Sequence, residues 1–479
     1  MTNLLFLFTD QQRFDTLQAY GNDRIHMPNL DRLAGHSYVF ERCYVTQPVC
    51  TPSRSTIMTG LFPHTSGCTA NNVPLPPEVK CLPEMLAPGE FYTGYFGKWH
   101  LGDEIFRQHG FDEWRSIEDG YRKYYRPGRD RDAHSTYHDF LISRGFKPKE
   151  GKYFTRGEAA RLPEKFGKPA YLAMEAKNFI RENYSRPFVL FVNFLEPHMP
   201  YFGPRDGQYR PDDVYLPRNF DFPPTDEQPL KTRLFQKAYF QYGHGGQPLR
   251  TEADWRELIA RYWGLCSLVD TYVGEILKTL QDCGIYDDTM IVFTSDHGDM
   301  MGSHRLLAKC VMFEEAVRVP LMVKLPGQKK GARVRTPVSQ VDLVPTILEE
   351  LSQDVPPHLE GRSLRDVIDG GSQRNVFVEW NGPNTGVSKL REVAPHLSDE
   401  EIRRAISAPV RCVVTPDGWK LNLSEIGEHE LYNLKTDPLE TKSLFANPRY
   451  AALVDKLSDL ILDWQTRTRD PIDLPDTRS

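Results

Sequence analysis

Short apolar runs alternate with segments of helical spacing along the first 370 residues. Runs typical of buried strands cover Asn3 to Thr9, Phe91 to Phe96, Pro187 to Phe194, Thr289 to Thr294 and Val319 to Leu325. Helical apolar spacing covers Pro28 to Leu33, Ala170 to Asn183, Thr251 to Cys283 and Leu343 to Leu351. Apolar strands that alternate with helices are typical of a parallel sheet buried on both faces. The pattern therefore predicts an α/β fold with a mostly parallel central sheet between helices.

The pattern changes after about residue 370. Short strands joined by turns are predicted at Val376 to Trp380, Arg411 to Thr415, Trp419 to Leu423 and Glu430 to Leu434, before a final helix from Tyr450 to Thr466. We therefore predict a large domain over residues 1–370 and a smaller α+β subdomain over 371–479, with an antiparallel sheet and a helix. Ile105 to Lys168 is a long irregular insert, which is typical of a lid or a substrate loop.

Composition and charge exclude several classes of protein. The chain has 479 residues, of which 39% are hydrophobic and 26% charged, as in a globular protein. A net charge of −6 argues against a nucleic-acid partner. The apolar run Leu4 to Phe8 is too short to cross a bilayer and lacks the flanks of a signal peptide. We expect no membrane partner and a cytoplasmic location; the pattern makes no prediction of oligomeric state.

Polar clusters follow three of the predicted strands. Asp10 and Gln11 follow the first, His198 comes after the third, and Asp296 and His297 follow the fourth. Because ligands bind at the carboxyl ends of strands in open α/β sheets, we expect the clusters to converge. Each aspartate taken singly is more typical of a helix cap or a turn. Together, two carboxylates, an amide oxygen and an imidazole favour a site for Ca²⁺, Mg²⁺ or Mn²⁺ rather than a structural Zn²⁺.

The segment from Cys50 to Gly60 combines a cysteine, a proline and an arginine. Pro52 fits the first turn of a helix, which places Cys50 at or just before the helix N-terminus. That end of a helix stabilises a thiolate or an oxyanion, and Arg54 adds a positive charge. An incidental cysteine in a helix cap is the alternative interpretation.

Several motifs together resemble a known family. Cys50-Thr51-Pro52-Ser53-Arg54 with Met58-Thr59-Gly60 resembles the signature of the type I, formylglycine-dependent sulfatases of the alkaline phosphatase superfamily. Four further segments are similar to that family in the same order: Gly97 to Gly102, Pro197 to Pro200, Asp296 to Lys309 and Glu430 to Pro438. The resemblance spans nearly the whole chain. It implies an alkaline phosphatase-like fold whose larger domain is catalytic.

The resemblance also implies roles for individual residues. Asp10, Gln11, Asp296 and His297 would hold one divalent cation, with Ca²⁺ expected and Mn²⁺ or Mg²⁺ as alternatives. Cys50 would be converted by a formylglycine-generating enzyme, and the hydrated aldehyde would attack a small-molecule or carbohydrate sulfate ester. Arg54 would fix this nucleophile, Lys98 and Lys309 would neutralise the sulfate oxygens, and His198 would act on the leaving group. His100 would take a proton from the sulfated intermediate.

The metal set leaves alternatives open. Asp10-Gln11 with Asp296-His297 resembles the choline sulfatases and the phosphonate monoester hydrolases, which makes phosphonate monoester or phosphodiester hydrolysis the second hypothesis. A binding scaffold with unmodified Cys50 is the third.

Four other positions have two interpretations each. Asn72 is a substrate contact or a turn residue, and His304 is a substrate contact or part of a solvated loop. Tyr121 to Arg126 grips an anionic sugar or forms a basic loop. Trp380 lines the pocket or belongs to a strand core.

Overall fold

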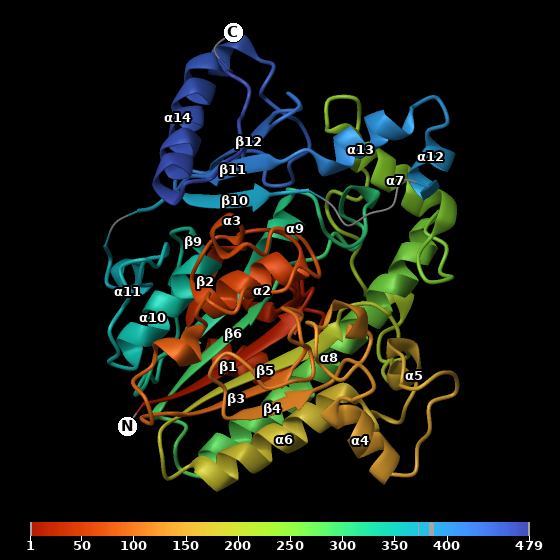
Figure 1. Ribbon diagram of the computed structural model, residues 1–479. Coiled ribbons are helices and arrows are strands. Elements are labelled where there is room, and N and C mark those ends of the chain that lie inside the picture. The colour runs from red at the N-terminus through yellow and green to blue at the C-terminus, as the bar shows by residue number, and fades with distance from the viewer. Residues whose placement is uncertain (1, 372, 383–387, 478–479) are drawn as a thin grey trace.

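The computed structural model describes residues 2–371, 373–382 and 388–477, and a central sheet runs through the larger part of it (Figure 1). The strand order is β4-β3-β5-β1-β6-β7-β2-β8, and β9 also pairs with β2. Every neighbouring pair is parallel except those of β7, which runs antiparallel to β6 and β2. The predicted mostly parallel sheet is confirmed. Its strands are β1 (Asn3–Asp10), β2 (Tyr38–Tyr44), β3 (Tyr92–Gly97), β4 (Glu113–Ser116), β5 (Phe188–Pro197), β6 (Thr289–Ser295), β7 (Arg318–Lys324), β8 (Ala332–Val334) and β9 (Val338–Ser339).

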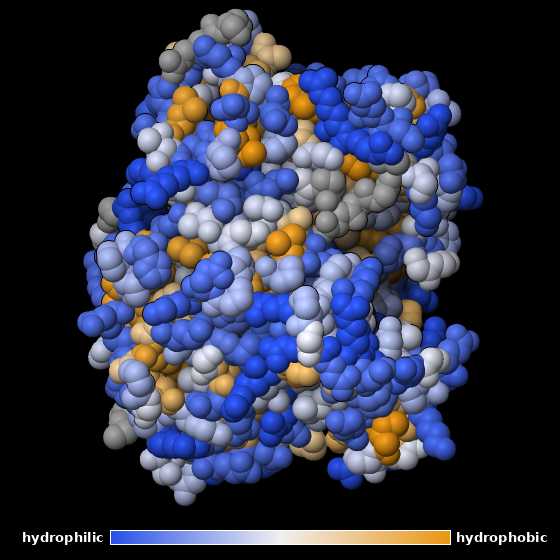
Figure 2. Space-filling model, in the orientation of Figure 1, coloured by the Kyte–Doolittle hydropathy of each residue, from blue (hydrophilic) through white to orange (hydrophobic). Residues whose placement is uncertain are grey.

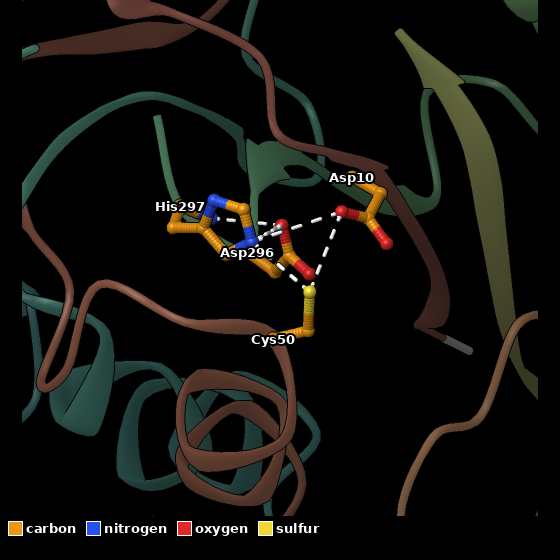
Figure 3. Close-up of side chains that lie close together, drawn as sticks. All are labelled: Asp10, Cys50, Asp296 and His297. Atoms are coloured by element: carbon orange, nitrogen blue, oxygen red, sulfur yellow. Dashed lines mark hydrogen bonds and ion pairs between the residues drawn. The ribbon is translucent and has the colours of Figure 1, made fainter. Parts of the chain in front are cut away.

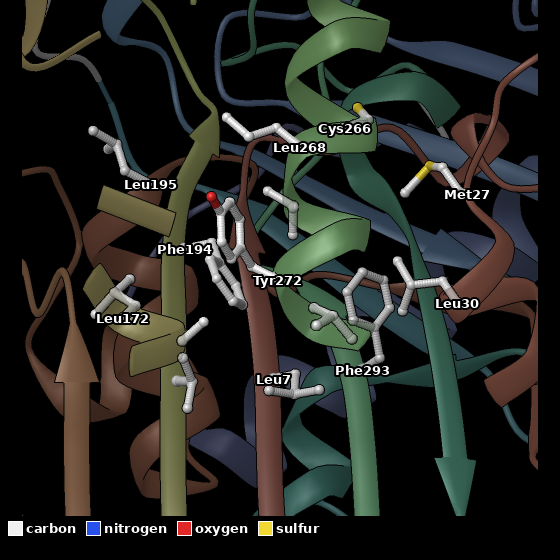
Figure 4. Close-up of a cluster of buried hydrophobic side chains, with 14 of the residues drawn as sticks. Leu7, Met27, Leu30, Leu172, Phe194, Leu195, Cys266, Leu268, Tyr272 and Phe293 are labelled. Atoms are coloured by element: carbon white, nitrogen blue, oxygen red, sulfur yellow. The ribbon is translucent and has the colours of Figure 1, made fainter. Parts of the chain in front are cut away.

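Helices cover both faces of this sheet because its strands bury side chains on both sides. Leu5 and Leu7 of β1 belong to a hydrophobic cluster with α1 (Pro28–Ala34), α6 (Lys168–Asn183) and α8 (Glu252–Asp282). Figure 4 shows part of this cluster, with Leu7 beside Phe293 and Tyr272. Successive strand residues point to opposite faces. Leu4, Phe6 and Phe8 therefore pack into a second cluster with α2 (Cys50–Thr59) and α10 (Leu343–Glu350).

The carboxyl-terminal region forms a second sheet, which Figure 1 shows at the end of the molecule near the C-terminus. The order β10-β11-β12-β13 is antiparallel throughout, and α14 (Ala451–Thr468) packs against it. The four predicted strands and the last helix are confirmed, with bounds of β10 (Val376–Trp380), β11 (Val410–Val414), β12 (Trp419–Ser424) and β13 (Glu430–Asn433). Phe62 and Val341 share the core of this sheet. The domain boundary at residue 370 stays a prediction.

Shorter helices lie around these two sheets. They are α3 (Pro63–Ser66), α4 (Thr136–Ser143), α5 (Arg156–Ala160), α7 (Leu230–Tyr242), α9 (Glu314–Val317), α11 (Arg365–Ile368), α12 (Ser388–Val393) and α13 (Asp399–Ser407). Leu234 of α7 packs against Leu390 and Ile402 of α12 and α13, so α7 reaches the C-terminal region. Hydrophilic residues cover most of the face shown in Figure 2. Among the described helices, none combines the length and apolarity needed to span a bilayer.

Candidate active site

The predicted polar clusters meet at the carboxyl edge of the central sheet. The parallel strands β3, β5, β1 and β6 are neighbours in that order. Lys98 follows β3, His198 follows β5, Asp10 ends β1, and Asp296 follows β6. This is the edge at which ligands bind in open α/β sheets. The expectation that segments far apart in sequence converge here is confirmed.

The backbone leaves β1 at Gln11, so adjacent side chains reach the same site. Gln11 has a φ of 69°, and its N–H donates to Asp296 Oδ1 at 3.0 Å. Its side-chain amide donates to Tyr201 Oη at 2.6 Å, while its Oε1 accepts from Lys309 Nζ at 2.7 Å. An extended strand would have directed Asp10 and Gln11 to opposite faces.

Asp10, Cys50, Asp296 and His297 form a buried cluster that fits a divalent cation. One ligand atom from each lies within 4.8 Å of the others, and Figure 3 shows the side chains pointing toward one another. His297 Nδ1 lies 2.9 Å from the carbonyl oxygen of Gly298, which places a proton on Nδ1. The lone pair of Nε2 is then available beside Asp10 Oδ1 at 3.7 Å and Asp296 Oδ1 at 3.5 Å. A hydrogen bond that fixes the tautomer in this way is usual for a metal-binding histidine.

Cys50 is the first residue of α2, as predicted from Pro52. Its Sγ lies 3.1 Å from Lys309 Nζ and 3.2 Å from His297 Nε2. Burial and Asp10 raise the pKa of the thiol, but Lys309, Lys98 and His297 outweigh them and lower it to about 6. The surroundings of Cys50 therefore stabilise a negative charge at this atom.

Arg54, one turn further along α2, ties three strand ends together. Its Nη2 donates to Asp10 Oδ2 and its Nε to Asp296 Oδ2, each at 2.9 Å. Its Nη1 donates to the carbonyl oxygen of Lys98 and to Asn193 Oδ1, each at 2.7 Å. Within the described residues all four acceptors are buried, so the guanidinium fork holds the cluster in one geometry.

Lys98 reaches the same carboxylate from the end of β3. Its Nζ donates to Asp10 Oδ2 at 2.6 Å. Burial favours the neutral carboxyl, but Lys98, His198 and Arg54 hold the pKa of Asp10 well below its usual range. Gly97 makes this approach feasible, because a Cβ there would lie 2.1 Å from the carbonyl oxygen of Asn193.

His100 has one ring nitrogen without a partner. Its Nε2 lies 3.0 Å from Asn72 Oδ1, so Nε2 carries the proton and donates it to the amide oxygen. Its Nδ1 is buried and has no hydrogen-bond partner in the described part of the chain. Burial, Lys98 and Arg54 lower the pKa of His100 well below its usual value. The imidazole is therefore neutral at pH 7, with the Nδ1 lone pair available as a base.

His198 is held by the insert that precedes α6. Its Nδ1 lies 2.7 Å from the carbonyl oxygen of Met199 and 3.4 Å from Arg156 Nη1. Burial lowers the pKa of His198, Asp10 opposes this, and Lys309, Arg156 and Lys98 lower it further. Arg156 also donates to Tyr121 Oη at 2.7 Å, and the Tyr121 ring packs on His100 with ring centroids 4.4 Å apart.

Sequence reasoning missed Arg156, Asn193 and Glu104 as parts of the site. Asn193 offered a signal, as a polar residue inside an otherwise apolar strand. Glu104 accepts from the backbone N–H groups of Trp99 and His100 at 2.8 and 2.6 Å. Arg156 lies in the insert, where the sequence has no periodicity to place it.

His304 lies apart from this cluster. Its Nδ1 is 2.6 Å from the carbonyl oxygen of Phe222, its Nε2 is 3.1 Å from Asn219 Nδ2, and its ring stacks on Phe313. Both ring nitrogens are thus engaged by the protein itself. Among the predicted site residues, the structure brings together all but this one.

Comparison with known proteins identifies the class. Residues 2–352 match the model of the Sulfatase family, and the chain belongs to that family. It is a sulfuric ester hydrolase.

Individual relatives differ in their reactions. The chain is 29% identical over 465 residues to a choline-sulfatase of Rhizobium meliloti, covering 93% of this chain and 83% of that one. It is 25% identical over 526 residues to an N-acetylglucosamine-6-O-sulfatase of Bacteroides thetaiotaomicron, covering 98% and 87%. The phosphonate monoester hydrolase SpPMH from Silicibacter pomeroyi has the same fold, with a TM-score of 0.81, 23% identity and coverage of 98% and 96%.

Proposed function

We propose that the protein hydrolyses a sulfate monoester with a formylglycine made from Cys50, through a covalent sulfated intermediate. The observation that carries this proposal is the setting of Cys50. Its side chain lies at a helix N-terminus beside Lys309 and His297. A hydrated aldehyde at this position would lie among groups that stabilise negative charge.

The donor set supports a bound divalent cation, with Ca²⁺ expected and Mn²⁺ or Mg²⁺ as alternatives. Asp10, Gln11, Asp296 and His297 would hold it. Gln11 is neutral, and so would be His297 once its Nε2 binds the cation, so the set would carry two formal negative charges. A cation here would screen the negative sulfate oxygens, which otherwise repel a nucleophile.

The side chains around Cys50 support a complete reaction sequence. A hydroxyl of the gem-diol gives its proton to the carboxylate of Asp10, which lies 3.8 Å from Cys50 Sγ, and its oxygen attacks sulfur. Lys98 and Lys309 neutralise the sulfate oxygens, and the bond from sulfur to the ester oxygen breaks. His198 gives a proton to that oxygen; the incoming anion raises the pKa of the imidazole and so favours its protonated form. His100 Nδ1 then removes the proton of the second hydroxyl, sulfate leaves, and the aldehyde is restored.

Phosphonate monoester or phosphodiester hydrolysis is the second candidate function. Gln11 and His297 stand where a more acidic site would place carboxylates, and the similar fold of SpPMH is consistent with this chemistry. A binding scaffold with unmodified Cys50 is the third candidate. The proposal includes a formylglycine-generating enzyme in the same compartment, which we expect to be the cytoplasm. It also includes a small-molecule or carbohydrate sulfate as substrate.

The test measures turnover and metal dependence together. Protein from its natural host is stripped with a chelator and assayed with 4-nitrophenyl sulfate and phenyl 4-nitrophenyl phosphonate, with and without Ca²⁺, Mn²⁺ or Mg²⁺. We expect cation-dependent release of nitrophenol, with the larger kcat/KM for the sulfate. A larger value for the phosphonate would favour the second candidate, and no turnover of either ester would favour the scaffold.

A further inference from the structure

Lys231 is a buried cation without a counter-ion. It lies on α7 with 9% of its surface exposed. Among the described residues, none forms an ion pair or a hydrogen bond with its Nζ, and Cys310 is the titratable group that acts on it. Burial lowers the pKa of Lys231 to about 7. A lysine in such a position is rare, because a buried charge is costly unless it is paired.

Trp380 lies directly beside this lysine. Lys231 Nζ is 3.5 Å from the centroid of the Trp380 ring, and Trp380 is 3% exposed. The indole Nε1–H is buried and has no acceptor in the described part of the chain. A buried donor without an acceptor is unusual, and it lies next to a lysine that has no acceptor among the described residues. The sequence allowed two interpretations of Trp380, as a residue that lines a pocket or as part of a strand core. The structure places it on β10, where it is buried.

Both residues line one small cavity. The cavity has a volume of about 40 Å³ and lies between α7, β10 and the loop Val311 to Phe313. This exceeds the roughly 10–15 Å³ that one water molecule needs. Glu428 and Glu430 also line it, but Glu428 accepts from the N–H of Leu230, and Glu430 accepts from Tyr432 and Asn422. These carboxylates are engaged elsewhere and do not act on Lys231.

Val311 lines the cavity, and the residue before it is Cys310. This residue follows Lys309, whose Nζ contacts Cys50 Sγ at 3.1 Å. Burial raises the pKa of Cys310, and the charges that act on it are those of Lys231, Lys309 and Cys50. Cys310 is thus within electrostatic reach of Lys231 and of the reactive centre. The cavity lining therefore begins two residues from the lysine that contacts Cys50.

We propose that Lys231 and Trp380 form a leaving-group subsite that binds an anionic substituent, a carboxylate or a second sulfate, of the ester. The anion supplies the missing counter-ion of Lys231 and an acceptor for Trp380 Nε1. The natural substrate is accordingly a sulfate ester whose leaving group carries a second negative charge. This inference rests on the proposed sulfate ester hydrolysis.

The first test compares substrates that differ in one charged group. Values of kcat/KM are measured for 4-nitrophenyl sulfate and for the same ester with a ring carboxylate or a ring sulfonate. For each protein, the kcat/KM of each anionic ester is divided by that of 4-nitrophenyl sulfate. This ratio is compared between wild type, Lys231→Met, Trp380→Phe and Lys237→Met. Lys237 is an exposed lysine on the same helix and serves as the matched control. Comparing each ratio with wild type cancels the intrinsic reactivity of the esters.

We expect Lys231→Met to lower the ratio for an anionic ester at least about tenfold, the size of a lost hydrogen bond to a charged group. Trp380→Phe should lower it several-fold, and Lys237→Met should leave it unchanged. The ester with the larger effect identifies carboxylate or sulfonate as the preferred group. Equal ratios in wild type and Lys231→Met for both anionic esters would overturn the subsite.

A second test reads the subsite without turnover. Calorimetry measures binding of 4-nitrophenol and its ring-carboxylate analogue to Cys50→Ala protein. We expect the carboxylate to tighten binding about tenfold and Lys231→Met to abolish this gain. No gain would overturn the subsite. A gain in Cys50→Ala protein, together with wild-type protein that hydrolyses neither ester, would contradict the proposed sulfatase reaction while supporting the anion site.

Discussion

The two ends of the proposed site, one for the sulfate and one for the leaving group, differ in how they balance charge. At the sulfate end, Lys98 and Arg54 are fully buried, and both donate to the carboxylate of Asp10 at 2.6 and 2.9 Å. At the leaving-group end, Lys231 is almost as buried but has no carboxylate partner among the described residues. Paired charges make a rigid site before substrate arrives. An unpaired buried charge is compensated only when a ligand of opposite charge binds beside it.

The largest effect should come from removing the nucleophile at the sulfate end. Cys50→Ala eliminates the aldehyde precursor, and we expect kcat to fall by about 10⁴-fold or more. Cys283→Ala, at the solvent-facing end of α8, is the matched control and should keep its activity. Steady-state hydrolysis of 4-nitrophenyl sulfate measures both. Activity of Cys50→Ala near that of wild type would rule out Cys50 as the precursor.

Replacing one lysine at each end should change stability in opposite directions. Lys98→Met leaves Asp10 buried with one cation fewer, and we expect a loss of about 3–5 kcal/mol in the free energy of unfolding. Lys231→Met removes an unpaired buried amine, and we expect a gain of about 3 kcal/mol at pH 7. Urea denaturation measures both. If both variants lost a similar free energy of unfolding, the proposed difference between the two ends would be wrong.

The tautomer of His100 provides a prediction on catalysis alone. Asn72→Gly removes the acceptor of His100 Nε2, and glycine accepts the Asn72 φ of 64° without strain. We expect kcat to fall about tenfold, because the Nδ1 lone pair is no longer fixed toward the substrate. Rapid-quench measurement of the sulfated intermediate should show that it accumulates. An unchanged rate of its breakdown would remove Asn72 from the proposed mechanism.

The stability difference at Lys231 should depend on pH. Burial holds the pKa of Lys231 at about 7, below the value of about 10.4 in an unfolded chain. Between these values the unfolded chain binds more protons than the folded chain, so wild-type stability rises with pH. The advantage of Lys231→Met should shrink by about 1 kcal/mol per pH unit from pH 7 to 10. Parallel urea titrations at pH 7 and 9.5 measure it, and a constant difference would contradict it.

The smallest effect on catalysis should come from His304. Its ring nitrogens are engaged by Phe222 and Asn219, so His304→Gln should change KM less than about twofold. Thermal denaturation should show a lower Tm, because the stack on Phe313 is lost. A several-fold rise in KM without a change in Tm would restore the sequence-based interpretation of a substrate contact.

The sequence predicted the elements whose burial is uniform. Residues 188–194 of β5 and 289–294 of β6 are buried on both faces and mostly apolar, so their patterns needed no tertiary context. β2 was missed because Glu41 and Arg42 interrupt its apolar pattern, and α7 because its buried side includes Lys231 and Thr232. The reversed direction of β7 depends on pairing between distant segments, which local pattern does not determine.

The candidate site divides in the same way. Asp10, Cys50 and Asp296 lie next to predictable strand and helix ends, so their convergence followed from topology. Arg156 and Lys231 come from an irregular insert and from a helix that was not predicted. Their positions depend on how these segments pack against the sheet, and this packing cannot be predicted from the spacing of residues in the sequence.

The central claim is that Cys50 is the precursor of the nucleophile. Mass spectrometry of the tryptic peptide from Cys43 to Arg54, taken from protein made in its natural host, tests it most directly. The account predicts a mass loss at Cys50 that equals conversion of the thiol to an aldehyde. An unmodified Cys50 in a preparation that is active on sulfate esters would contradict it.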